Sequence, residues 1–492
     1  MTHVARSAQI VVTALLVGVL GQFLFFDVGL GVNFPLLIGA LLLAAWLTVD
    51  PSRRRPRLAD AWLPLAAIGF AIPIAVRADR SLLALDVLGS LALTAASMAV
   101  LGGLRVVDRP LGGLLVQGLR VLGAVAGWAA GATASALRGL PSGSLRRGLG
   151  RWAGVLRGLL IALPLVFIFL ALFSAADAVF AHWVERLTGW DLDLGGAIGR
   201  TFVALVIAWL AGGLLAFVAE PGGSEAERQL MGAWPRRPRI GSAEVVTALV
   251  VLDLLFAAFV ILQAAYLFGG LDTLAESGLT YAEYARRGFF ELLAVAFLVG
   301  GLVLGAESFV RVRTRAYLTA LIGLVVLTLV VLASAFLRLR LYQDAYGWTE
   351  MRFYVMAAIF WLAIGAAIAI GTILANRSAW LLHGMLGLSI VFGAVFNVIG
   401  PVRFVADQNV GRILGSGLTG GKTDFDLAYL IDLGGDAVPA VSRWLSDRPL
   451  PPEVVQRITD EMAWASGLDD PRNEAWQAWN LSREHARELL GR

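Results

Sequence analysis

Asp253 is a carboxylate within an apolar run, VVLDLLFAAF, over residues 250–259. An ionisable side chain at membrane depth is costly, so one found there is either functional or paired. A carboxylate in such surroundings could take up and release a proton during transport. The alternative is a structural carboxylate paired with an Arg, Tyr or Gln of another helix. The residues leave both interpretations open.

Four further carboxylates lie within or at the ends of apolar segments: Asp86, Asp177, Glu291 and Glu307. Asp86, Asp177 and Glu307 lie near the predicted membrane interfaces, where long arginine and tyrosine side chains can reach them. For these three we expect structural pairing rather than chemistry.

Three connections between apolar segments mix arginines, carboxylates and tyrosines. They are TYAEYARRGFFELL at 280–293, RLRLYQDAYGWTEMRFY at 338–354 and FNVIGPVRFVADQNVGR at 396–412. If the first is helical, Glu283, Arg287 and Glu291 share one face, because they are spaced four residues apart. Aromatic residues and snorkelling arginines are usual at membrane interfaces, which is the plain alternative. The added carboxylates favour a polar binding site. The predicted substrate-binding residues are Asp253, Glu283, Arg287, Glu291, Arg338, Arg340, Tyr342, Asp344, Arg352, Arg403 and Asn409.

The composition decides which class of protein must position these residues. Of 492 residues, 58% are hydrophobic and 15% are charged, and the mean hydropathy is +0.76. A soluble domain carries about 25% charged residues. The sequence therefore predicts an all-α polytopic membrane bundle, with the lipid bilayer as its surroundings.

Apolar segments long enough to cross a bilayer recur along the chain. We predict eleven spans, near 8–26, 28–49, 61–76, 82–104, 158–181, 198–219, 243–269, 289–310, 316–337, 353–375 and 379–399. Arginines concentrate in alternate loops, at 53–57, 228–239, 311–315 and 377. Because basic loops stay in the cytoplasm, we expect the N-terminus inside and the C-terminus outside.

The spans divide the chain into four predicted regions. Membrane helices occupy 1–104 and 158–400, and an arginine-rich amphipathic segment over 105–157 is expected to lie on the inner leaflet. A twelfth span near 121–136 is the alternative for part of that segment. Residues 401–492 form a predicted helical tail outside the membrane, which could bind an envelope protein partner.

Several other kinds of site are not expected. The chain has no cysteine and four scattered histidines, so thiolate and multi-histidine metal sites are excluded. His182, Glu185, Asp191 and Asp193 are too loosely spaced for a hard-cation site. The stretch GSGLTGGKTD at 415–424 has Ser416 where a phosphate loop needs glycine. We expect no cofactor, no metal and no nucleic acid partner.

The three connections, together with DLAYLIDLGGDAVPAVSRWL at 426–445, resemble a family of bacterial integral-membrane proteins. It is catalogued as a domain of unknown function, number four-one-seven-three, and the similarity covers about 242–444. The turn near Asn397 departs from the family pattern, because Pro401 does not follow the asparagine directly. The resemblance implies a polytopic protein of a bacterial inner (cytoplasmic) membrane with a helical tail. It implies no established activity and no catalytic residues.

Three functions are compatible with these features. Asp253 at mid-membrane favours transport or binding of a small solute, because transporter sites lie near the midplane. The tail, with Trp464, Trp476 and Trp479, favours a scaffold or sensor. The arginine clusters favour an enzyme using a lipid-linked donor, with Arg338 and Arg340 on a phosphate and Glu283 or Asp344 as base. We rank transport first; whether the protein is an enzyme is left open.

Overall fold

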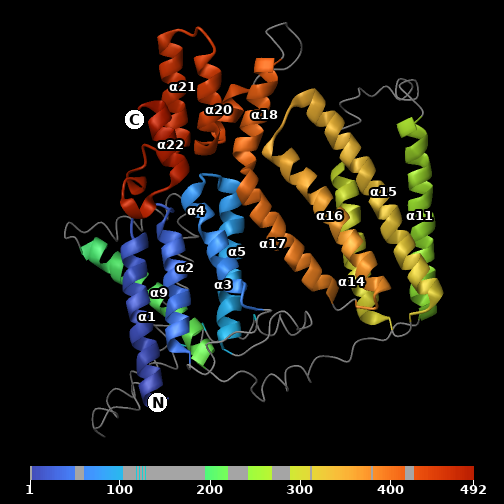
Figure 1. The fold of residues 1–492 in the computed structure, drawn as a ribbon, viewed down its shortest axis with the longest axis horizontal. Coiled ribbons are helices and arrows are strands. Elements are labelled where there is room, and N and C mark those ends of the chain that lie inside the picture. Colours follow the sequence, from blue (N-terminus) through green and yellow to red (C-terminus); the bar gives the residue numbers. More distant parts are fainter. Residues whose placement is uncertain are drawn as a thin grey trace, which may run out of the picture. The chain divides into compact units, whose positions relative to one another are not determined.

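A computed structural model gives the fold (Figure 1). It describes residues 3–49, 60–102, 118, 121, 123, 125, 128, 194–219, 242–268, 289–310, 313–377, 380–415 and 426–492. Within these residues the regular structure is helical and no strand is formed, so the predicted all-α membrane-type bundle is confirmed. The contacts divide the chain into two units, Met1–Ala233 with Gly467–Glu484, and Trp234–Ser466 with His485–Arg492.

The first unit contains the N-terminal helices and a short C-terminal segment. Its helices are α1 (His3–Phe25), α2 (Asn33–Thr48), α3 (Leu63–Ala71), α4 (Pro73–Val76), α5 (Arg80–Leu101) and α9 (Leu194–Ala219). Gly18 allows α1 to approach α9 closely, since a Cβ there would run into the Ala204 carbonyl. Asp79 caps α5 by accepting the amides of Ser81 and Leu82 at 2.8 and 3.0 Å.

The C-terminal segment of this unit packs on the loop between α1 and α2. The Gly29 amide donates to the Arg472 carbonyl at 2.8 Å, and the Val32 amide donates to the Trp479 carbonyl at 3.0 Å. The segment includes two 3-10 turns, η4 (Pro471–Asn473) and η5 (Trp476–Ala478), and the start of α22 (Leu481–Leu490). It therefore lies at the end of α1 away from the N-terminus.

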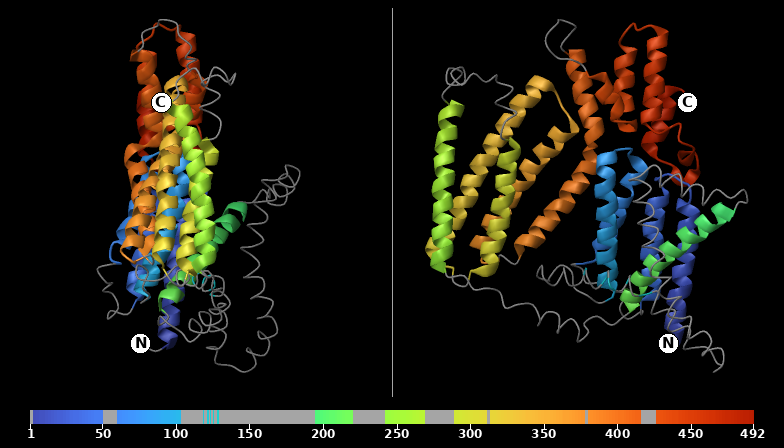
Figure 2. Two further views of the ribbon diagram at one scale, coloured as in Figure 1. Left: turned by 90° about the vertical axis from the view of Figure 1, so that its right-hand side faces the viewer. Right: turned by 180° about the vertical axis from the view of Figure 1, so that it is seen from behind.

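The second unit contains the long helices of the C-terminal half (Figure 2). They are α11 (Ser242–Phe268), α14 (Phe289–Phe309), α15 (Arg315–Tyr346), α16 (Glu350–Leu374), α17 (Leu381–Ile399) and α18 (Pro401–Gly415). Helix α15 packs against α11, α14 and α16, and Leu321, Leu324 and Leu332 are fully buried at its centre. Shorter helices follow: α19 (Leu427–Asp432), η3 (Gly435–Ala437), α20 (Val438–Ser446) and α21 (Pro452–Ala465).

Local sequence explains where these helices begin and end. Thr314 and Thr349 cap α15 and α16, each accepting an amide three residues ahead, at 3.1 and 3.3 Å. Gly400, at φ +65°, and Pro401 separate α17 from α18. Glycine suits the left-handed position, and proline suits the first turn of the next helix.

The predicted spans agree well with the helices. Every predicted span except 158–181, which lies outside the described residues, coincides with a helix or, for 61–76, with the pair α3 and α4. Seven described helices are long and apolar enough to cross a membrane, and Asn33–Thr48 and Leu63–Val76 are shorter apolar helices. One boundary was wrong: α15 continues to Tyr346 instead of ending near 337. Segment 105–157 is almost entirely outside the described residues, so its position on or across the membrane stays a prediction.

Candidate functional site

Asp253 lies in a groove between α11 and α15. The groove has a volume of about 810 Å³. Almost all of its lining is apolar, and Asp253, Arg315 and Thr319 supply its polar side chains; the full lining is Val250, Asp253, Leu254, Ala257, Arg315, Leu318, Thr319, Ile322, Gly323, Val326, Leu327 and Leu374. The Asp253 carboxylate thus lies among mostly apolar side chains.

The Asp253 carboxylate is incompletely satisfied. Its Oδ1 is buried and has no hydrogen-bond partner among the described residues. Its Oδ2 faces Gly323 of α15, where an added Cβ would lie 3.4 Å from that oxygen. Buried polar atoms are almost always hydrogen-bonded in folded proteins, so an exception calls for an explanation such as a ligand or ion.

The other polar groups of the groove do not supply a hydrogen-bond partner for the Asp253 carboxylate. Thr319 donates its hydroxyl to the Arg315 and Ala316 carbonyls, both at 3.0 Å. Arg315 starts α15, eight residues before Gly323 and thus about 12 Å away along the helix. The described chain contains no ion pair between Arg315 and Asp253. Asp253 is therefore available to a bound group.

A second cavity in this unit is mostly apolar, and the polar side chains in its lining are hydrogen-bonded within the protein. It has a volume of about 210 Å³ and lies between α14, α15, α16 and α17, with Phe297, Trp361 and Met385 in its wall. The Thr328 hydroxyl in its lining donates to the Leu324 carbonyl at 2.7 Å, and the Trp361 indole N–H donates to the Ser389 hydroxyl at 3.2 Å. Among its described lining residues, the cavity therefore offers no unpartnered polar side-chain atom to a ligand, in contrast to the groove at Asp253.

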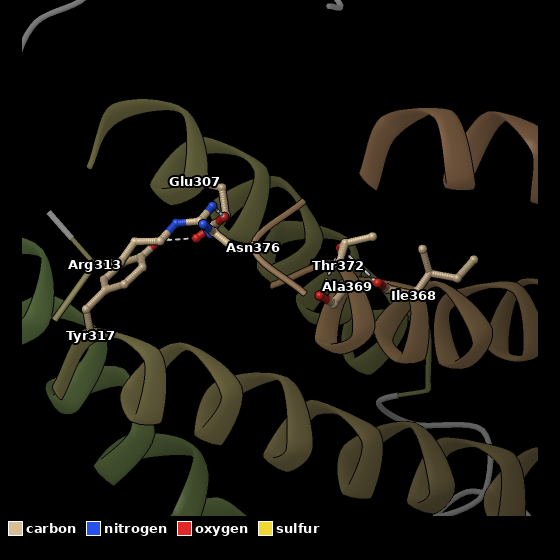
Figure 3. A network of polar contacts seen from close by, with 7 residues as sticks. All are labelled: Glu307, Arg313, Tyr317, Ile368, Ala369, Thr372 and Asn376. Carbon is tan, nitrogen blue, oxygen red and sulfur yellow. Dashed lines mark hydrogen bonds and ion pairs between the residues drawn. The ribbon is translucent and has the colours of Figure 1, made fainter. Parts of the chain in front are cut away.

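Glu307 lies in a polar network at the junction of α14, α15 and α16 (Figure 3). Its carboxylate pairs with Arg313 and accepts the Tyr317 hydroxyl at 2.8 Å. Arg313 also donates to Asn376 Oδ1 at 2.5 Å, and Asn376 adopts φ +55° just after α16. The Glu307 side chain is 5% exposed. The expected structural pairing of Glu307 is confirmed, and the network holds three helix ends together.

The predicted polar site assembles in part around the turn from α15 to α16. Asn409 of α18 donates to the Trp348 carbonyl at 2.8 Å and accepts the Trp348 amide at 2.9 Å. Arg352 donates to the Tyr346 and Gly347 carbonyls at 3.2 and 2.5 Å. Its guanidinium also lies 4.2 Å from the centre of the Tyr342 ring. Predicted residues Tyr342, Arg352 and Asn409 are thus neighbours.

Asn409 and Arg352 form these hydrogen bonds with backbone groups of the protein, and two further residues do the same. Arg412, which the predicted site omitted, donates to the Gln343 and Asp344 carbonyls at 3.3 and 2.7 Å. The Tyr429 hydroxyl accepts the Glu350 amide at 2.9 Å, and burial raises the pKa of Tyr429 above its ordinary value. These contacts close the ends of α15 and α16, so we call Tyr342, Arg352, Asn409, Arg412 and Tyr429 the turn clamp.

The remaining predicted residues are not members of the clamp, although the Asp344 carbonyl accepts a hydrogen bond from Arg412. Glu291 is exposed in the first turn of α14. Arg340 and Asp344 form a loose pair at 4.0 Å on the surface of α15, and Arg403 lies 3.8 Å from Asp407, which also pairs with Arg443. Arg338 is half-buried on α15. Glu283 and Arg287 lie outside the described residues.

Asp253 and the turn clamp are separate places in the second unit. Along α15, Gly323 beside Asp253 precedes Gln343 at the clamp by about 30 Å, at 1.5 Å per residue. The lining of the groove includes none of the clamp residues. The arrangement therefore gives one candidate binding site, at Asp253, and one structural clamp.

The long apolar helices make this a multi-pass all-α membrane protein. A family model described as a domain of unknown function (DUF4153) matches residues 65–444, and the chain belongs to that family. The family number expected from the sequence, four-one-seven-three, was wrong, and the match begins far before residue 242. No curated protein and no solved structure matches the chain.

Proposed function

We propose that this protein is a membrane carrier that binds a small solute in the groove between α11 and α15. The observation that carries the proposal is the Asp253 carboxylate, whose Oδ1 is buried without a partner among the described residues, within a helix long and apolar enough to cross a membrane. Ionisable groups in such positions mark substrate or ion pathways in membrane proteins. Helix α11 runs from Ser242 to Phe268, so Asp253 lies near its middle. Transporter sites commonly lie near the midplane of the bilayer, which agrees with this position.

Transport can be tested on the purified protein in liposomes that enclose a pH-sensitive dye. Amines, amino acids, sugars, organic acids and lipophilic ions are added one class at a time, with and without a pH gradient. We expect at least one class to give flux that falls tenfold or more in Asp253→Asn. Asp253→Glu should keep part of that flux, because it keeps the charge.

Asp447→Asn is the matched control, since Asp447 is an exposed carboxylate after α20 and far along the chain from the groove. It should leave the flux unchanged. If no solute class gives flux that depends on Asp253, the carrier proposal is wrong.

We further propose that the N-terminus lies inside and the C-terminus outside the bacterial inner membrane. The arginine-rich loops support this orientation. The contacts of Gly29 and Val32 with Arg472 and Trp479 support opposite sides for the two termini, since they lie at the far end of α1. Reporter fusions after Arg492 should be active only outside the cytoplasm. Activity in the cytosol would refute the orientation.

A second candidate function is a scaffold or sensor that binds an envelope partner through its tail. Trp464, in the last turn of α21, is 75% exposed, and a large exposed aromatic side chain is typical of binding surfaces. Under this hypothesis Trp464→Ala removes a co-purifying partner without changing the unfolding temperature. Identical co-purified proteins from wild type and variant would argue against it.

A further inference from the structure

We infer that the groove at Asp253 binds lipophilic cations, meaning organic molecules with one positive charge on an apolar body. The inference rests on the proposed carrier function and names its substrate class. It is carried by charge complementarity: in the part of the chain that the structure describes, one carboxylate with an unpartnered Oδ1 lies among apolar walls on both α11 and α15. Val250 and Leu254 line the groove from α11, and Ile322 and Val326 line it from α15.

The lining argues against other classes of ligand. An anion would be repelled by Asp253. A sugar or another neutral polar solute needs several hydrogen-bonding groups, whereas the Thr319 hydroxyl already donates to backbone carbonyls. A hard metal cation takes about six or more oxygen ligands, and the groove offers one carboxylate. A single positive charge on an apolar body fits both features of the groove.

The exposed rim of the groove indicates where such a ligand would enter. Leu254 on α11 is 67% exposed, and Val326 on α15 is exposed on the facing helix. Both lie within segments that are long and apolar enough to cross a membrane. We therefore expect the opening to face the hydrocarbon region, into which lipophilic cations partition, so that entry is lateral.

Arg315 is the other charged residue in the groove lining. It lies about two helical turns from Gly323, at the start of α15. A cation in the groove is repelled by Arg315 and attracted by Asp253, so the positive charge should settle at Asp253. The apolar body would then lie along Ile322, Val326 and Leu254.

Tetraphenylphosphonium and tetraphenylborate test the inference, because they have nearly the same shape and opposite charge. Binding of each to the purified full-length protein in detergent is measured by equilibrium dialysis against protein-free micelles. We expect tetraphenylphosphonium to bind at least tenfold more tightly than tetraphenylborate, a difference of about 1.4 kcal/mol. This comparison needs no variant, so it stands even where a substitution fails to fold.

Variants then locate the binding site. Asp253→Asn should weaken tetraphenylphosphonium binding at least tenfold, while Asp253→Glu keeps most of it and Asp447→Asn leaves it unchanged. Gly323→Leu should also weaken binding, because its side chain would extend over the Asp253 carboxylate. Arg315→Gln should strengthen binding, since it removes the competing positive charge.

Equal binding of the two probes, or cation binding that is unchanged in Asp253→Asn, would overturn the inference. Failure here is distinguishable from failure of the carrier proposal. Flux of another solute that depends on Asp253, without tetraphenylphosphonium binding, overturns the cation class and leaves the carrier standing. Cation binding at Asp253 without flux of any solute supports the site and overturns the carrier.

Discussion

Asn409 holds Trp348 at both of its peptide groups, with its Nδ2 on the Trp348 carbonyl and its Oδ1 on the Trp348 amide. One amide side chain on α18 thus fixes the short turn between α15 and α16, sixty-one residues earlier in the chain. The neighbouring Gly347 is at φ +77°, and a Cβ there would lie 2.8 Å from Asn409 Oδ1. The turn therefore depends on a glycine backbone and on an asparagine that fits against it.

Asn409→Ala should destabilise the second unit. Both hydrogen bonds to Trp348 are lost and two partly buried peptide groups lose their partners, which costs about 1–3 kcal/mol. Chemical unfolding of the purified protein in detergent measures the change. Gln408→Ala is the control, because the adjacent Gln408 side chain is exposed. Equal stability of the two variants would show that the bonds to Trp348 do not hold the turn.

Gly31→Ala should detach the C-terminal segment from the first unit. A Cβ on Gly31 would collide with the backbone of Ala478 and Trp479, which cannot move as a flexible side chain could. We expect faster proteolysis within 467–484 and a lower unfolding temperature. Gly39→Ala on α2 is the matched control: nothing lies within 4 Å of its added Cβ, and alanine favours a helix over glycine by about 0.5–1 kcal/mol.

Two polar side chains reinforce the same contact. Asn480 donates to the Ile74 and Arg77 carbonyls at 2.9 and 2.7 Å, and Arg483 donates to the Leu30 carbonyl at 2.7 Å. Asn480→Ala should therefore reproduce the proteolysis seen with Gly31→Ala. A segment that stays protected in both variants would contradict its docking on the loop between α1 and α2.

The ion pair of Glu307 with Arg313 can be compared with an exposed ion pair, to measure how much each contributes to stability. Removing one partner of a buried ion pair costs about 3–5 kcal/mol, and Arg313 is 25% exposed, so we expect Glu307→Gln to fall at or below the lower end of that range. Asp344→Asn breaks a pair with Arg340 that is 4.0 Å long and exposed, and should cost less than about 0.5 kcal/mol. A cycle with Tyr317→Phe measures how far the Glu307 contacts are coupled.

The helices were largely predictable because each apolar segment is long and its flanks are charged. The extension of α15 was missed because Arg338, Arg340 and Asp344 looked like a polar loop. Long arginine side chains can leave a helix surface for the interface, so charge alone does not end a helix. The pairing of Glu307 was predictable from its place near the end of a span, with arginines close behind it.

The candidate site was predictable only as far as Asp253 itself. Its position opposite Gly323 depends on how α11 and α15 pack, and a glycine in an apolar run gives no sign of its neighbour. The backbone contacts of the turn clamp were not predictable, because arginine, asparagine and tyrosine can bind either a ligand or backbone carbonyls. Arg412 hydrogen-bonds to a backbone carbonyl 68 residues earlier, and Tyr429 to a backbone amide 79 residues earlier. No rule of sequence spacing predicts contacts between residues so far apart in the chain.

The pKa of Tyr429 gives the turn clamp a predicted dependence on alkaline pH. Burial is the main cause of the raised pKa; the amide of Glu350, which donates to the hydroxyl, opposes it. A pKa above the unfolded value of 10.0 means that the folded state holds the proton more tightly. The stabilisation is therefore complete below pH 10 and is lost as the pH rises through the folded pKa.

Tyr429→Phe should separate this effect from general alkaline unfolding. At neutral pH the variant loses the acceptor for the Glu350 amide, a cost of about 0.5–1.5 kcal/mol, and above pH 10 its stability should fall less steeply than that of the wild type. Tyr346→Phe is the matched control, since Tyr346 is exposed at the end of α15. Its ring lies 4.8 Å from that of Tyr342, so this variant removes a hydroxyl beside the clamp that does not accept the Glu350 amide. If both variants keep the slope of the wild type, the proton on Tyr429 is not linked to the closure of the clamp.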